Sequence, residues 1–118
     1  MKAERITLDQ FRERLLAQGV AGVEDAAFIC PSCKTVQSAR SLIAAGVGST
    51  LDEVEGYLAF SCVGRFQEGI GCDWTLGGLF QIHELEVVTP DGEVHRRFRI
   101  ASPEDARQLA ASLQQASA

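Results

Sequence analysis

Long apolar runs and a positive net charge are both missing from this 118-residue chain. Its longest apolar stretches are far shorter than the roughly 18 residues that a membrane-spanning helix needs. Lys and Arg number 11 against 16 Asp and Glu, for a formal net charge of −5 at pH 7. An excess of acid argues against broad electrostatic binding to DNA, because such binding depends on Lys and Arg neutralising phosphates. The composition therefore favours a protein without a membrane span and makes nucleic acid the less expected partner.

The start of the chain lacks the pattern of a secretion signal, because "MKAERITLDQFRER" carries charges throughout and has no apolar core segment. We therefore expect a cytoplasmic protein, in a compartment whose reducing conditions disfavour disulfides.

Familiar catalytic patterns are missing as well. The sequence has no G-x-S-x-G, no P-loop, no Rossmann glycine pattern and no H-E-x-x-H. "CPSC" resembles the second half of the zinc deaminase signature, but residues 1–29 contain no H-x-E or C-x-E. We expect the protein not to be an enzyme, although the sequence leaves an unknown chemistry open.

Four cysteines are present, at C-x2-C spacing and then at C-x9-C spacing: Cys30, Cys33, Cys62 and Cys72. Four thiolates complete a tetrahedral zinc site, and a tight turn aims two sulfurs three residues apart at one ion. Pro31 presets φ for that turn. The nine residues between the second pair include three glycines, which suit a loop that returns the chain to the same point.

The favoured interpretation is thus a structural Zn²⁺ held by all four cysteines. Three alternatives stay open. Cys30 and Cys33 can form a redox pair, although the βαβ pattern that such pairs accompany is missing. The cysteines can be buried free thiols or disulfides, because cysteine is often a small buried apolar residue. His83 or His95 can replace one cysteine as a ligand.

Local signals predict one α+β domain over residues 1–118, with a small antiparallel sheet flanked by N- and C-terminal helices. Capping residues and stop signals predict helices over 7–19, 38–46, 50–56 and 102–115. Apolar and β-branched runs predict strands over 26–30, 57–66, 74–80, 83–89 and 93–100. "TPDG", residues 89–92, is typical of the turn of a hairpin. Zinc is expected to join the segment 28–33 to a hairpin at 60–74.

Two stretches are candidate partner-binding surfaces. "GCDWTLGGLFQI", residues 71–82, carries Trp74 and Phe80, although packing under the zinc site is the commoner explanation of such residues. "HRRFR", residues 95–99, supplies Arg96, Arg97 and Arg99 for an acidic partner or a nucleic-acid backbone. A charged strand edge facing solvent is the commoner explanation of such a stretch.

The segments "FICPSC", "FSCVGR", "GCDWTLGGLFQIH" and "LEVVTPDG" together carry a resemblance. The chain resembles a family of small uncharacterised proteins that are frequent in phage and prophage genomes. The resemblance implies that the four cysteines bind a metal and that the protein belongs to a phage-associated context. A more general likeness to zinc ribbons rests on Cys30 and Cys33, and the nine-residue gap before Cys72 departs from the short second knuckle of a ribbon.

These observations predict a non-enzymatic zinc-binding module for protein–protein interaction. We expect a phage or prophage accessory protein that engages a host or phage protein in the cytoplasm of a bacterium or an infected host cell. The alternative is a nucleic-acid-associated zinc module that uses the basic strand 95–99. The sequence indicates no oligomeric state.

Overall fold

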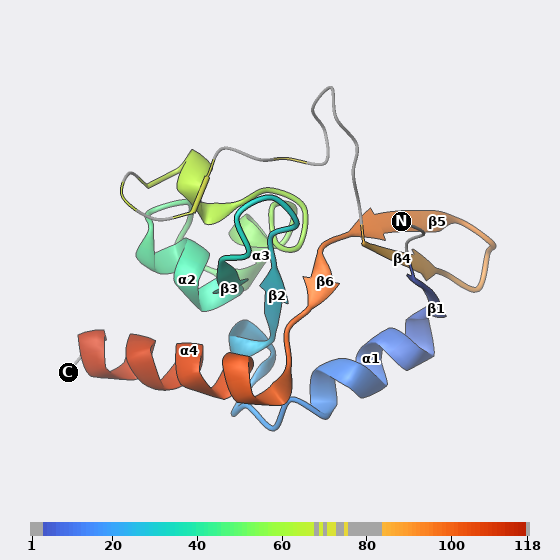
Figure 1. Cartoon of the computed structure of the whole chain (residues 1–118), viewed down its shortest axis with the longest axis horizontal. Coiled ribbons are helices and arrows are strands. Elements are labelled where there is room, and N and C mark those ends of the chain that lie inside the picture. The colour runs from blue at the N-terminus through green and yellow to red at the C-terminus, as the bar shows by residue number, and fades with distance from the viewer. Residues whose placement is uncertain (1–3, 68, 70, 73–74, 76–83, 118) are drawn as a thin grey trace.

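The computed structural model describes residues 4–67, 69, 71, 72, 75 and 84–117, with backbone alone for 114–117. Figure 1 shows the arrangement of the elements. In chain order they are β1 (Glu4–Thr7), α1 (Leu8–Leu16), the 3₁₀ helix η1 (Val23–Asp25), β2 (Ala27–Ile29), β3 (Val36–Ser38), α2 (Ala39–Ala44), α3 (Leu51–Val54), the 3₁₀ helix η2 (Val63–Arg65), β4 (Leu85–Val88), β5 (Val94–Arg97), β6 (Arg99–Ile100) and α4 (Pro103–Ser117). The α+β class is confirmed.

The described strands form two small sheets, whereas one antiparallel sheet was expected. The first has the order β1-β4-β5, with β1 parallel to β4 and β5 antiparallel to it. The second has the order β3-β2-β6 and is antiparallel throughout. In Figure 1, α1 lies against the first sheet and α4 lies along the second. The flanking position of these two helices is as predicted.

Local capping explains where the helices begin. Thr7 forms a full capping box with Gln10, and Ser38 forms one with Ser41. Thr50 accepts a hydrogen bond from the backbone N–H of Glu53 at the start of α3. Each cap satisfies a backbone donor that has no partner within its helix, so the starting point is encoded within about four residues.

Two strand predictions fail for residues that the structure describes. Residues 57–60 form turns and Val63–Arg65 is a 3₁₀ helix, so 57–66 is not a strand. Several apolar side chains in the middle of this stretch are buried through core packing instead, as Val63 shows with 1% exposure. Strand 93–100 is interrupted at Phe98, where the chain leaves the first sheet and enters the second. The predicted strand 74–80 lies outside the described residues except for Thr75, which forms a single β-bridge with Ser61.

Phe98 is the joint between the two sheets. Its side chain is completely buried, and its backbone N–H donates to the Ala59 carbonyl at 2.7 Å rather than to a strand. The largest core cluster contains Phe98 together with Phe28, Leu42, Cys30 and Cys62. Burial of this aromatic ring therefore fixes the point at which β5 ends and β6 begins.

Two buried polar groups tie the second sheet to its surroundings. The Gln18 amide, 1% exposed, donates to the carbonyls of Ala27 and Ala101 and accepts from the Ala27 N–H. The buried Asp25 carboxylate lies 2.7 Å from Arg40 Nε at the edge of α2. Both groups have the partners that burial demands.

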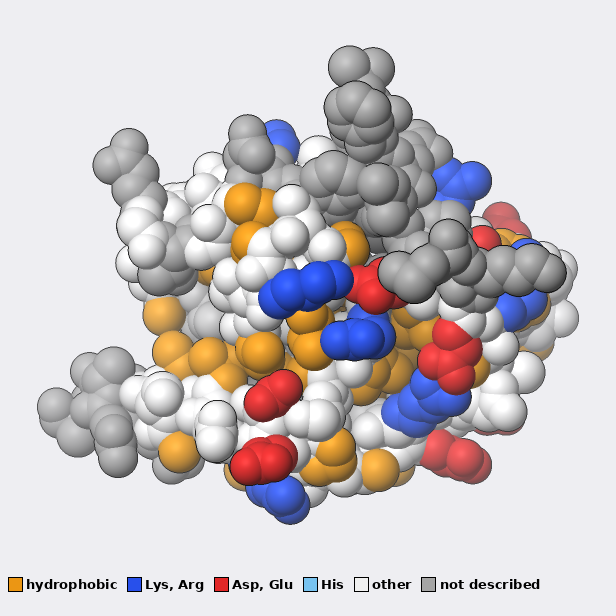
Figure 2. All heavy atoms as spheres, viewed as in Figure 1, with side chains coloured by type: hydrophobic (Ala, Val, Ile, Leu, Met, Phe, Trp, Pro, Cys, Tyr) orange, Lys and Arg blue, Asp and Glu red, His pale blue; other side chains and the backbone are white. Residues whose placement is uncertain are grey.

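Apolar side chains also reach the surface in the orange band above α4 in Figure 2. Among the described residues, no helix combines the length and the apolar character that crossing a bilayer requires.

Candidate metal centre

The first cysteine pair sits in the turn that joins β2 to β3. Cys30 follows β2 directly, its N–H donates to the Thr35 carbonyl at 3.1 Å, and the Lys34 N–H donates back to the Cys30 carbonyl at 2.9 Å. Lys34 takes a left-handed conformation with φ 64°, which lets the chain reverse tightly. The turn is therefore a knuckle between two antiparallel strands, and the described part of the chain places no βαβ unit of the kind that accompanies a redox pair around it.

A longer loop, rather than a tight turn, brings the second cysteine pair together. Cys62 precedes η2, and the Cys72 N–H donates to Cys62 Sγ at 3.3 Å. Among the described residues of the expected hairpin, Ser61 forms a β-bridge with Thr75, and their hydroxyls lie 2.9 Å apart. This bridge lies at the base of the segment that returns the chain to Cys62.

Gly71 allows that return. It has φ +64°, and a Cβ placed on it would lie 2.7 Å from Cys62 Sγ and 3.0 Å from the Gly64 nitrogen. Any other residue would be strained in its backbone and would collide with the sulfur. The sequence predicts that the glycines of this loop help the chain to return to the same point, and Gly71 does so by allowing a close approach between backbone and sulfur.

All four sulfurs meet at one point. Each lies within 4.8 Å of the others, and the pairs Cys30–Cys72 and Cys33–Cys62 are each separated by 3.7 Å. Sulfurs bound tetrahedrally at about 2.3 Å from zinc lie about 3.8 Å apart, which agrees with both pairs. A disulfide needs about 2.05 Å, and all four cysteines are free. The donor set and its spacing therefore fit a metal such as zinc, held by Cys30, Cys33, Cys62 and Cys72.

The two halves of the cluster differ in exposure. Cys30 and Cys62 are completely buried, and Cys33 and Cys72 are partly exposed. Burial raises the pKa of the Cys30 thiol, against the effect of backbone N–H groups of Cys33 and Ser32 that hydrogen-bond its sulfur. Burial also acts to raise the pKa of Cys33, but hydrogen bonds with the side chain and backbone of Thr35 and with the sulfurs of Cys72 and Cys62 together outweigh it and lower that pKa to about 7. A divalent cation would favour the thiolate at every position, since thiolate is the form that binds metal.

Gln37 supports the centre and was not predicted. Its side chain is 1% exposed, its Nε2 lies 3.8 Å from Cys62 Sγ, and its Oε1 accepts a 2.8 Å hydrogen bond from the Val63 N–H. Because Gln37 belongs to β3, it fastens the Cys62 segment to the strand that follows the knuckle. Its only signal in the sequence is a polar residue within a very short strand, which is too common to single it out.

The other candidate residues do not join this centre. Among the described residues, the group that could hold a metal ion consists of the four cysteines alone, so His95 is not part of it. His83 lies outside the described residues. Trp74 and Phe80 also lie outside the described residues. Lys34 lies 3.6 Å from Glu84 Oε1, an ion pair at the edge of the knuckle.

The three arginines of 95–99 have different environments. Arg96 and Arg99 are exposed, but the Phe98 joint puts Arg99 in the other sheet. The Arg97 guanidinium lies 5.9 Å from the ring centre of Phe60, and burial lowers its pKa. The expected single stripe of arginines on one strand is therefore divided between two sheets.

A family model described as VVA0879-like matches residues 7–101. The chain belongs to the VVA0879-like family. The matched region of this VVA0879-like chain contains all four cysteines, Gln37 and Gly71. No curated protein and no solved structure matches the chain.

Proposed function

We propose that the four cysteines hold one structural Zn²⁺ that clasps the β2–β3 knuckle to the Cys62–Cys72 loop. The observation that carries this proposal is the pair of 3.7 Å sulfur separations inside a set of four thiols. A catalytic zinc keeps one position open for water or substrate, whereas four thiolates close the coordination sphere. The residues therefore suit an ion that stabilises the fold. The knuckle is of zinc-ribbon type, and the second half, with its 3₁₀ helix and long loop, is not.

Zinc is expected to matter greatly for stability because the described strands have only two to four residues each. Structural zinc contributes about 10–16 kcal/mol of apparent free energy in small modules. An ordinary domain has a total stability of about 5–15 kcal/mol. Loss of the ion is thus expected to unfold the region that it joins.

Metal analysis of protein purified without added metal tests the proposal, with one zinc per chain as the expected result. Cys33→Ser is expected to lose the metal and the cooperative thermal transition. Ser32→Ala, at an exposed position inside the same knuckle, is the matched control and is expected to retain both. A wild-type protein that carries almost no zinc and keeps its fold in a strong chelator would contradict the clasp.

We further propose that the zinc-held domain is a non-enzymatic module for protein–protein interaction. Support comes from the closed donor set and from large apolar side chains that remain on the surface, among them Leu16 with 81% exposure and Val23 with 56%. Exposed apolar groups that lie together mark interaction sites in soluble proteins. The proposed role as a cytoplasmic accessory protein of a phage or prophage rests on the sequence resemblance alone.

A nucleic-acid-associated module that uses Arg96, Arg97 and Arg99 is the second proposal. The exposure of Arg96 and Arg99 favours it, whereas the burial of Arg97 against Phe60 and the net charge of −5 oppose it. A gel-shift titration at two salt concentrations separates the two functions. Binding that weakens steeply with salt and disappears in the triple alanine variant would establish nucleic acid as the partner.

A further inference from the structure

Helix α1 leaves its apolar face incompletely covered. Leu8, Phe11 and Leu15 recur on one face of the helix, yet none of the nine residues of α1 is buried. Leu16 is 81% exposed. Leu8, Phe11 and Leu15 pack against the core but stay partly exposed, so the outer part of this face remains available to another molecule.

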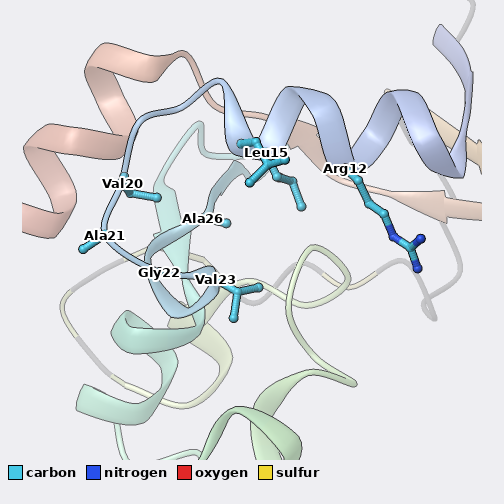
Figure 3. A pocket seen from close by; sticks show the side chains of 8 residues that line it. Arg12, Leu15, Val20, Ala21, Gly22, Val23 and Ala26 are labelled. Atoms are coloured by element: carbon cyan, nitrogen blue, oxygen red, sulfur yellow. The ribbon is translucent and has the colours of Figure 1, made fainter.

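Three pockets that share lining residues lie along α1 on this side and together form a groove. One section, of about 380 Å³, lies between the C-terminal half of α1 and residues 20–26, and it is lined by Arg12, Leu15 and Val23. The next section, about 230 Å³, shares Leu15 and Val23 with the first and adds Phe11 and Leu58. Figure 3 shows Arg12 extending from α1 toward the side of the molecule on which Val23 of η1 lies.

A third section extends the groove to the beginning of α1. It has a volume of about 250 Å³, includes Leu8 and His95, and shares Phe11 and Arg97 with the second section. From Leu8 to Leu16 the helix rises about 12 Å, which is the length of two turns of a second helix. The dimensions therefore suit a short helix laid against α1, a common mode of peptide recognition.

The charge of the groove is opposite to that of the whole chain. Its charged lining residues, within the described part of the protein, are Arg12, Arg97 and Glu55. Arg12 has no hydrogen bond or ion pair with any described residue, and Arg97 contacts the Phe60 ring and the Arg96 carbonyl but no described carboxylate. The groove thus has a net positive lining in a protein of net charge −5.

We propose that this groove binds an acidic amphipathic helix of another protein, with aliphatic side chains beside Leu15, Leu16 and Val23 and a carboxylate on Arg12. The inference rests on the proposed role as an interaction module and gives the chemistry of its partner. The apolar floor provides affinity by burial, and the Arg12 guanidinium, which has no ion pair among the described residues, selects an acidic helix over a basic one.

Fluorescence polarisation with two labelled, capped peptides of roughly 16 residues tests the proposal. Both carry leucine at i, i+4, i+7 and i+11, and the flanking positions are glutamate in one peptide and lysine in the other. The glutamate peptide is expected to saturate the zinc-loaded protein, and the lysine peptide to bind at least about ten-fold more weakly. Equal binding of the two peptides, or binding of neither, would overturn the proposal.

Variants at exposed positions place the binding in the groove without endangering the fold. Arg12→Glu is expected to weaken the glutamate peptide by about ten-fold or more and to strengthen the lysine peptide. Leu16→Glu is expected to abolish binding of both peptides. Arg107→Glu on α4, which is exposed and does not line the groove, is the matched control and is expected to change neither affinity. Unchanged binding by Arg12→Glu, with its circular dichroism equal to wild type, would refute the assignment.

Two further measurements separate the possible failures. Self-association of the wild type that Leu16→Glu abolishes would overturn the proposal, because the occupant would then be a second copy. If no peptide binds, capture from cell extract shows which idea has failed. A partner retained by both the wild type and the Arg12→Glu, Leu16→Glu double variant overturns the groove and leaves the interaction module standing. No partner for either protein counts against the module itself.

Discussion

Gly71→Ala is expected to damage the metal centre specifically, and Gly69→Ala in the same loop provides the matched control. Both glycines have positive φ, +64° for Gly71 and +90° for Gly69. A Cβ on Gly69 would meet nothing within 4 Å, whereas a Cβ on Gly71 would lie 2.7 Å from Cys62 Sγ. The two substitutions therefore share their backbone strain and differ in the contact with the sulfur.

The expected magnitudes follow from these distances. An L-residue in the left-handed region lowers the free energy of unfolding by about 1–2 kcal/mol, and this loss applies to both variants. Ordinary contacts between heavy atoms begin at about 3.5 Å, so the new methyl group and Cys62 Sγ must separate by about 0.8 Å. Metal–ligand distances tolerate about 0.2 Å. We therefore expect Gly71→Ala to lose about 100-fold in zinc affinity, or about 2.7 kcal/mol, in addition to the shared strain.

The assay is an equilibrium competition for zinc against a chromophoric chelator, followed by thermal unfolding of the zinc-loaded proteins. Gly69→Ala is expected to keep the wild-type zinc affinity and to unfold at a moderately lower temperature. Gly71→Ala is expected to lose zinc to the chelator and to unfold at a much lower temperature. Equal zinc affinity in the two variants would refute the view that the approach of Gly71 to Cys62 positions the sulfur.

Three pairs of substitutions test other parts of the fold. Gln18→Leu leaves buried backbone groups without partners and is expected to lower the free energy of unfolding in urea by about 3 kcal/mol. Its control is Gln108→Leu, at an exposed position on α4, which is expected to change the free energy of unfolding by less than about 0.5 kcal/mol. Arg40→Ala leaves the buried carboxylate of Asp25 without its ion-pair partner and is expected to lower the free energy of unfolding by about 1–3 kcal/mol. Arg14→Ala removes an ion pair whose partners are 44% and 53% exposed and is expected to lower the free energy of unfolding by at most about 1 kcal/mol. Lys34→Gly and Lys34→Ala both lose the ion pair with Glu84. Glycine adopts the left-handed conformation of this position without strain, so Lys34→Gly is expected to be more stable than Lys34→Ala by about 1 kcal/mol. In each comparison the reverse order would contradict the role assigned to the residue.

Features encoded by neighbouring residues were predictable from the sequence. The starts of α1, α2 and α3 follow from Thr7, Ser38 and Thr50, because a cap acts on donors two or three positions away. The β4–β5 hairpin follows from the turn at 89–92, where Gly92 has φ +87°. The knuckle was predictable for the same reason, since the C-x2-C spacing and Pro31 describe one turn.

Features that depend on distant residues were not predictable. β1 pairs in parallel with β4, and its register joins Glu4 to Leu85. Only Ile6 of its four residues is buried, so β1 carries almost no periodic signal. The division of strand 93–100 depends on a core that receives Phe98, and a run of alternating residues does not reveal such a core. The close approach of Gly71 to Cys62 likewise becomes visible only when both segments are placed in space.

The position of the joint between the sheets links the metal centre to the whole fold. Phe98 donates to the carbonyl of Ala59, three residues before Cys62, and it packs in the same cluster as Cys30 and Cys62. A clasp that holds the Cys62 segment against β3 therefore also holds the backbone acceptor and the apolar pocket that fix Phe98. Because β5 and β6 enter different sheets on either side of this residue, loss of the proposed ion is expected to change the relative placement of both sheets. Such coupling would let the proposed metal stabilise both sheets, each of which has only three short strands.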